Sequence, residues 1–313
     1  MLKHSIPVIL IGLFAAASES CLLAQLTGPT KEAQPASTPY SAEESGAVTA
    51  ELSRKETDLR AALQQEPDSA GLLYGLALVL RQEGKPRESI DTYTRAAQKM
   101  KPTAEELRSA ALDYVLLKDY DDAIHWLEIA AQTDPNDATI LYSLGRCYYS
   151  RDRYLDAGKM YERVLAIEPR NLKAEENLGL VYDATNHSEK AEEALRTAAS
   201  WADKNGKDEW PFLDLGSFLL DRDRPKDAID PLRIAVSIRL GCAQCHEKLG
   251  RALVETHDVA AGIAELQEAT KLDPTDPKAH YELGRALRQA GQNERAQEEI
   301  KISQSLYAAH SQE

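Results

Sequence analysis

Apolar residues recur at spacings of three and four through the segment Ala138–Pro169, on both sides of one turn. This spacing places the apolar side chains of each half on one face of a helix. The pattern therefore predicts two short helices that pack against each other, because neither could bury its apolar face alone. The positions are Leu141, Leu144, Cys147 and Tyr148 in the first half and Tyr154, Ala157, Tyr161, Val164 and Leu165 in the second.

The same pattern returns with a period of 34 residues, interrupted by one three-residue insertion. Small residues return with it, so that Leu144-Gly145 has counterparts such as Leu178-Gly179, and Ala157 is matched by Ala191. We interpret the small residues as points where the two helices of a unit approach closely. The units begin at Ala70, Ala104, Ala138, Leu172, Glu209, Ala243 and Pro277.

A 34-residue period that combines a Leu-Gly pair, a tyrosine or leucine three residues after the glycine, a small-residue column and a closing proline resembles the tetratricopeptide repeat family. The resemblance covers residues 70 to about 305. It implies an all-α fold, a right-handed superhelical solenoid of about seven helix-turn-helix repeats. In such a solenoid each repeat contacts only its neighbours.

We divide the chain into five segments by these patterns. Residues 1–24 read as a signal peptide and residues 25–49, rich in proline and serine, as a disordered leader. Residues 50–67 match only half a repeat and are expected to form a helix that covers the N-terminal end of the stack. The solenoid is placed at 68–308 and a short tail at 309–313.

The signal peptide prediction rests on the apolar run Ile6–Ala17, which is shorter than the roughly 20 residues that span a bilayer. Cleavage after Ala24 or Ala17 fits the sequence, and we expect no stable membrane insertion afterwards. Cys21 leaves open a lipoprotein alternative, although the residues before it do not match a lipobox.

Composition and motifs narrow the function further. The chain has 37 basic and 51 acidic residues and a formal net charge of −14, which argues against nucleic-acid binding because phosphate contacts need a basic surface. It contains no HExxH motif, no glycine-rich phosphate loop and no GxSxG motif. We therefore expect neither enzymatic activity nor a cofactor.

Cys242, Cys245 and His246 nevertheless spell CxxCH, the motif through which c-type cytochromes attach haem. The repeat register offers a structural explanation, because Cys245 and His246 occupy the columns of Ala279 and His280. Three alternatives stay open at this point. They are haem attachment, a disulfide between Cys242 and Cys245, which an oxidising compartment would favour, and two free thiols.

In the family that the sequence resembles, the first helices of successive repeats line a concave groove that binds peptides or partner proteins. Arginine and tyrosine are common among the residues that contribute most binding energy at interfaces. Transferred onto this sequence, the groove positions include Tyr142, Arg146, Tyr149, Lys173, Asn177, Trp210, Arg251, Tyr281, Arg285 and Arg288.

The stretch formed by Arg251, Arg285 and Arg288 is basic within an acidic protein. We hypothesise that it receives an acidic partner segment. The alternative is that these arginines pair with acidic residues on neighbouring turns, namely Glu247, Glu255 and Glu282.

Together the patterns predict a non-enzymatic scaffold or adaptor of the exported or periplasmic space. Its partner would be a protein or peptide held in the groove. The alternatives are a c-type haem electron-transfer protein, or a repeat lipoprotein tethered to the outer membrane.

Overall fold

The computed structural model describes residues 42–310, which form helices α2 to α16 and no strand. The predicted all-α repeat fold is confirmed, and every first helix of a repeat begins within one residue of its predicted start. Within residues 42–310, no helix has the length and apolar character needed to cross a membrane. The helices are α2 (Ala42–Gln65), α3 (Ala70–Gln82), α4 (Pro86–Ala97), α5 (Ala104–Leu116), α6 (Tyr120–Thr133), α7 (Ala138–Ser150), α8 (Tyr154–Ile167), α9 (Leu172–Ala184), α10 (Ser188–Trp201), α11 (Trp210–Asp221), α12 (Pro225–Ile238), α13 (Ala243–Glu255), α14 (Val259–Leu272), α15 (Pro277–Gln289) and α16 (Asn293–His310).

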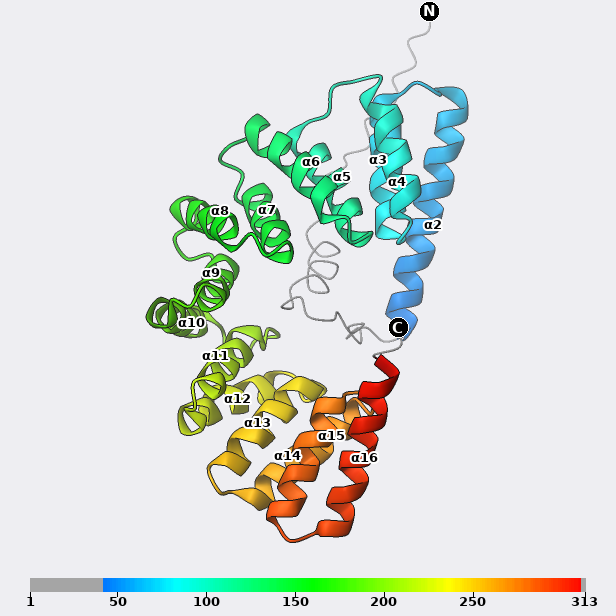
Figure 1. Cartoon of the computed structure of the whole chain (residues 1–313). Coiled ribbons are helices and arrows are strands. Elements are labelled where there is room, and N and C mark those ends of the chain that lie inside the picture. The colour runs from blue at the N-terminus through cyan, green and yellow to red at the C-terminus, as the bar shows by residue number, and fades with distance from the viewer. Residues whose placement is uncertain (1–41, 311–313) are drawn as a thin grey trace, which may run out of the picture.

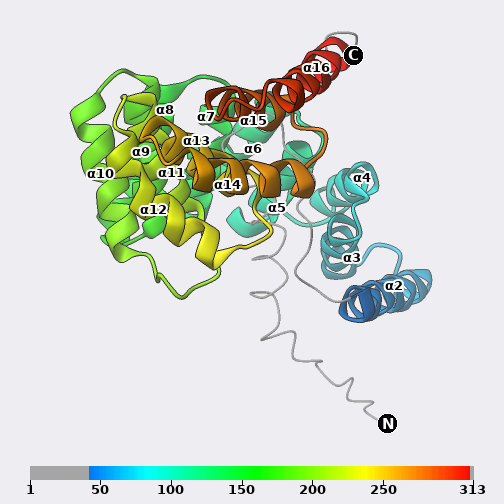
Figure 2. The same ribbon diagram turned by 90° about the horizontal axis from the view of Figure 1, so that it is seen from below.

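The helices stack into an open superhelical arc. Figure 1 shows α5, α7 and α9 on the inner side of the arc, with α6, α8 and α10 on the outer side. Successive first helices contact one another, as α9 does α11 and α11 does α13. Although α2 and α16 lie close together in Figure 1, Figure 2 shows them well separated along the other direction. Because α5, α7 and α9 lie on the inner side of the arc, the first helices of the repeats line its concave surface.

Close approach between the two helices of a repeat depends on the glycine column. A Cβ atom on Gly145 would lie 2.7 Å from Cε1 of Tyr161, and one on Gly179 would lie 2.8 Å from Cγ of Leu195. Such distances are too short for ordinary packing, so only glycine lets the large side chain of the second helix cross the first helix here. This confirms that the small-residue columns mark helix contacts.

Turn and cap residues set the ends of the helices. Thr103 forms a capping box with Glu106 at the start of α5, and the Asp137 side chain accepts backbone N–H bonds at the start of α7. Each turn inside a repeat contains one residue with left-handed backbone geometry, which favours glycine. These residues are Gly84, Lys118, Asp152, Asn186, Asp223, His257 and Gly291.

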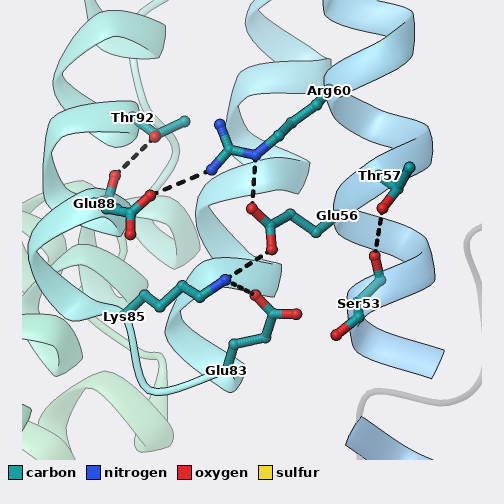
Figure 3. A network of polar contacts seen from close by, with 8 residues as sticks. All are labelled: Ser53, Glu56, Thr57, Arg60, Glu83, Lys85, Glu88 and Thr92. Atoms are coloured by element: carbon teal, nitrogen blue, oxygen red, sulfur yellow. Dashed lines mark hydrogen bonds and ion pairs between the residues drawn. The ribbon is translucent and has the colours of Figure 1, made fainter. Parts of the chain in front are cut away.

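Helix α2 covers the first repeat through a network of charged side chains. Glu56 of α2 lies between Arg60 and Lys85 (Figure 3). Its carboxylate oxygens are 2.6 Å from Nε of Arg60 and 2.8 Å from Nζ of Lys85. Arg60 also reaches Glu88 of α4 at 3.2 Å. The hydrogen bonds from Lys85 and Arg60 lower the pKa of Glu56 to about 2. The helix is thus fixed to the first repeat by ion pairs as well as by apolar contacts.

Two predicted boundaries need correction. Helix α2 begins at Ala42, so residues 42–49 are helical rather than part of a disordered leader. Alanine and glutamate at its start are strong helix formers, and acidic residues are favourable at a helix N-terminus. Helix α16 continues to His310, past the predicted end of the solenoid. The signal peptide and the leader up to residue 41 lie outside the described residues.

Candidate functional site

The predicted groove residues all lie on first helices, and none of them is fully buried. Side chains four residues apart share a face of a helix, so Tyr142 and Arg146 present the same surface of α7. We use the name central concave surface for Tyr142, Arg146 and Tyr149 of α7, Lys173, Glu176 and Asn177 of α9, and Asp214 of α11. Of the other predicted groove residues, Trp210 begins α11, Arg251 lies on α13, and α15 carries Tyr281, Arg285 and Arg288.

Hydrogen bonds join α7 to α9 at one edge of this surface. The amide nitrogen of Asn177 donates to the Tyr142 hydroxyl at 3.2 Å and to the backbone carbonyl of Lys173 at 2.8 Å. The Tyr142 ring also packs against the ring of Tyr161, with 5.9 Å between the centroids. Tyr142 and Asn177 are therefore held in place by contacts within the protein.

Lys173 links α9 to the loop before α11. Its ammonium group lies 2.8 Å from Oδ2 of Asp208 and 3.2 Å from Oε2 of Glu176. Glu176 is only 2% exposed, and its Oε1 has no hydrogen-bond partner. Burial raises the pKa of Glu176 to about 7, against the opposite effect of Lys173. The surface thus contains a carboxyl group that titrates near neutral pH.

Asp214 lies near this pair and has no hydrogen bond or ion pair with another residue in 42–310. It is 8% exposed, and burial raises its pKa well above the ordinary value, with the charges of Glu176 and Asp208 acting in the same direction. The ring of Tyr149 packs edge-on against Tyr154, with 5.2 Å between the centroids. Burial raises the pKa of Tyr149 to about 12, and Tyr154 and then Asp214 act in the same direction.

The arginines at the C-terminal end of the stack are partly paired within the protein. Arg251 lies 2.9 Å from Glu255 and 3.5 Å from Asp221, and Arg285 lies 2.8 Å from Glu282. The predicted internal pairing is therefore present for these two arginines. Glu247 has a different role, since it lies 3.6 Å from Lys278 and 3.9 Å from Lys248. Exposed Arg288 has no ion pair with another residue in 42–310.

The CxxCH segment forms a disulfide between Cys242 and Cys245 at the start of α13. Nδ1 of His246 lies 2.6 Å from a carboxylate oxygen of Glu265, and Nε2 donates to the carbonyl of Leu240 at 3.1 Å. Both sulfur atoms and both ring nitrogens are engaged within the protein, which does not fit haem attachment.

The same histidine arrangement recurs in the next repeat. Nδ1 of His280 lies 2.6 Å from Glu299, and Nε2 donates to the carbonyl of Pro274 at 3.2 Å. Each histidine therefore joins the second helix of its own repeat to the loop before the repeat, which is a structural role. Elsewhere in residues 42–310, no three His, Cys, Asp or Glu side chains are grouped so that they could hold a metal ion.

Sequence reasoning missed two residues of the site. Glu176 lies one 34-residue period after Tyr142, so the column rule that selected Tyr142 also points to it. Asp208 gave no comparable signal, because it belongs to the irregular loop before α11, where the repeat register is broken.

Comparisons with known proteins agree with this architecture. One tetratricopeptide repeat model matches residues 56–105, 109–171 and 247–302, and a second matches residues 176–205. BBSome complex member BBS4 of Bos taurus is 24% identical over 218 residues, covering 70% of this chain and 41% of that protein. The chain thus spans about two fifths of the length of this relative.

Two solved structures share most of the fold. A tetratricopeptide repeat protein from Parabacteroides merdae has a TM-score of 0.61 at 16% identity, covering 83% of this chain and 95% of that one. The yeast Tom70 has a TM-score of 0.61 at 15% identity, covering 91% of this chain and 67% of that one. At these identities the likeness concerns the fold alone. Because the first repeat model alone matches more than half of its residues, the chain belongs to the tetratricopeptide repeat family.

Proposed function

We propose that this protein is a non-enzymatic scaffold that binds an extended segment of a partner protein along the central concave surface. A tetratricopeptide repeat solenoid is suited to protein–protein interaction, since stacked repeats provide a long continuous surface. The observation that carries the proposal is the state of Arg146. This arginine is half-buried on α7 and has no hydrogen bond or ion pair with another described residue.

An arginine that lacks an internal partner can donate several hydrogen bonds to a ligand carboxylate or backbone carbonyl. Tyr149 on the next turn offers a rigid ring with a polar tip, a combination common at interfaces. Because Tyr142 and Asn177 are already fixed by contacts within the protein, a partner meets a surface that needs little ordering.

A peptide library tests this proposal directly. The full-length chain is immobilised and incubated with a positional-scanning library of extended twelve-residue peptides, and the affinity of the selected peptides is then measured. Arg146→Ala should weaken binding by about tenfold or more, as truncation of an interface arginine does. Arg233→Ala is the matched control, because Arg233 is exposed on the second helix α12 and has no ion pair with another described residue.

The outcomes are distinct. Binding that is lost in Arg146→Ala and kept in Arg233→Ala supports the proposal. Equal affinity of the wild type, Arg146→Ala and Arg233→Ala would indicate that the peptide binds outside this surface. If the wild type selected no peptide, the result would count against a peptide-binding scaffold.

The basic stretch at the C-terminal end extends the proposal to acidic segments. Arg251 and Arg285 have partners within the protein, so exposed Arg288 is the residue whose charge is most available. Arg288→Glu should therefore remove a preference for Asp or Glu at one peptide position. An unchanged preference would contradict the role of this stretch.

The proposal also places the protein outside the cytoplasm. It is supported by the pattern of residues 1–24 and by the disulfide between Cys242 and Cys245, since disulfides persist mainly in oxidising compartments. The intact mass of protein recovered from the exported fraction tests it. A mass that fits cleavage after Ala24 is expected. The mass of the full chain would contradict cleavage, and an acylated Cys21 would indicate the lipoprotein alternative.

A further inference from the structure

Asp214 differs from Glu176 and Asp208, whose charges act on it. It has no hydrogen bond and no ion pair with another described residue. Several carboxylates on α9 and in the segment just before α11 have a cationic partner: Lys173 pairs with Glu176 and Asp208, Arg222 with Asp183, and Arg239 with Glu209. Among the described residues, Asp214 thus lacks the cationic partner that these carboxylates have.

The surroundings of Asp214 do not compensate for this. Glu176 and Asp208 repel a negative charge on Asp214, and Lys173 is the cation that acts against them. Lys173 is already shared between those two carboxylates. Arg146 favours the ionised form of Tyr142 but has no such effect on Asp214. Among the described residues, Asp214 therefore has no cation that pairs with it directly.

Asp214 can nevertheless be reached from solvent. Glu176 and Glu209 each have a fully enclosed carboxylate oxygen without a hydrogen-bond partner, whereas Asp214 has no such enclosed oxygen. The Asp214 residue as a whole is 8% exposed. Both oxygens of Asp214 therefore keep some contact with solvent. A carboxylate that is mostly desolvated, unpaired and accessible provides a strong site for an entering positive charge.

Tyr149 adds to the site from α7, the first helix that precedes α9. Its hydroxyl makes no hydrogen bond to another described residue and is not enclosed. The charge of Asp214 contributes to the raised pKa of Tyr149, so the two groups lie close enough to interact electrostatically. A tyrosine offers both an acceptor oxygen and an aromatic face to a cation.

We propose that Asp214 and Tyr149 bind the ammonium or guanidinium group of a lysine or arginine in the extended partner segment. This inference rests on the proposed function, since it names one residue type that the segment must carry. Lys173 shows that the surface already holds an ammonium group between two carboxylates at 2.8 Å and 3.2 Å.

Binding of a cation should be coupled to proton release. Burial and the neighbouring acids raise the pKa of Asp214 and so favour its neutral form, whereas an entering cation favours the ionised form. The affinity for a basic peptide should therefore rise as the pH rises. The charged groups that act on Asp214 are Glu176, Lys173 and Asp208.

The test uses the full-length chain and the twelve-residue positional-scanning library. The wild type should select lysine or arginine at one position, over glutamine and norleucine. Asp214→Asn keeps the size of the side chain and should lose that selection, lowering affinity for the best basic peptide by about tenfold to a hundredfold. Asp230→Asn is the control, because it makes the same charge change at an exposed position of α12.

The two proposals fail in different ways. This inference would be overturned if the wild type bound peptides without a preference for lysine or arginine. It would also be overturned if that preference and the pH dependence of binding both survived in Asp214→Asn or in Tyr149→Phe. Either result would leave binding along the concave surface intact. Selection of no peptide by the wild type would overturn both. Unfolding curves of Asp214→Asn confirm that loss of selection is not loss of fold.

Discussion

Replacing Asp113 by asparagine should stabilise the protein above neutral pH. Asp113 on α5 is completely buried, and burial raises its pKa to about 7 from 3.8. Oγ of Ser89 lies 2.6 Å from Oδ2 of Asp113 and 2.7 Å from the carbonyl oxygen of Ala77. One hydroxyl proton cannot serve both contacts, so both are satisfied when a protonated Asp113 donates to Ser89.

The magnitude follows from this shift. The pKa of Asp113 is raised by about three units, and each unit corresponds to about 1.4 kcal/mol, so the ionised carboxylate costs about 4 kcal/mol. For a carboxyl group whose folded pKa is raised, the cost is absent below the unfolded pKa near 4, grows as pH rises, and is complete above pH 7. Asparagine can donate to Ser89 at every pH and does not ionise.

Urea unfolding followed by circular dichroism at pH 5 and pH 8 measures the difference. Asp113→Asn should exceed the wild type by about 1.5 kcal/mol at pH 5 and about 4 kcal/mol at pH 8. Asp91→Asn, an exposed change on the adjacent helix α4, should show no such trend. A variant that is less stable than the wild type at pH 8, or a difference that does not change with pH, would refute the reasoning.

Three further changes test the packing between the helices of a repeat, the turn inside a repeat, and the attachment of α2 to the first repeat. Gly179→Leu should cost roughly 1 to 3 kcal/mol through collision with Leu195, and an unchanged thermal unfolding temperature would contradict this. Lys118→Gly relieves a left-handed backbone at φ 60° and should raise stability by about 1 kcal/mol in urea; a loss would argue against strain there. Glu56→Gln should speed hydrogen exchange in α2 at pH 7 but have little effect at pH 2, because protonation of Glu56 has already weakened its contact with Lys85 there. Equal effects at both pH values would contradict the lowered pKa of Glu56.

The repeat register carried most of what the sequence predicted about the fold. Helix starts, the turn positions and the contact at Gly145 all depend on local patterns that repeat seven times, so each copy supports the others. The start of α2 at Ala42 was missed because this helix lies outside the register and is fixed to the first repeat by long-range ion pairs at Glu56.

The candidate site was predicted less completely, for physical reasons. Column positions place Tyr142 and Arg146 on the concave surface, but they do not show which charges neutralise one another. Arg251 and Arg285 looked available from sequence and are paired in the structure, whereas the isolation of Asp214 depends on where Lys173 places its ammonium group. Pairing of this kind is decided by side-chain geometry across several helices.

The most direct test of the central claim is photo-crosslinking with a library-selected peptide. A photoreactive residue is placed at Tyr149 on α7, which faces the concave surface, or at Leu155 on α8, which is 73% exposed and serves as the control. The account predicts that the peptide is crosslinked at position 149 and not at position 155. Crosslinking at position 155 alone, or equally at both, would contradict binding along the central concave surface.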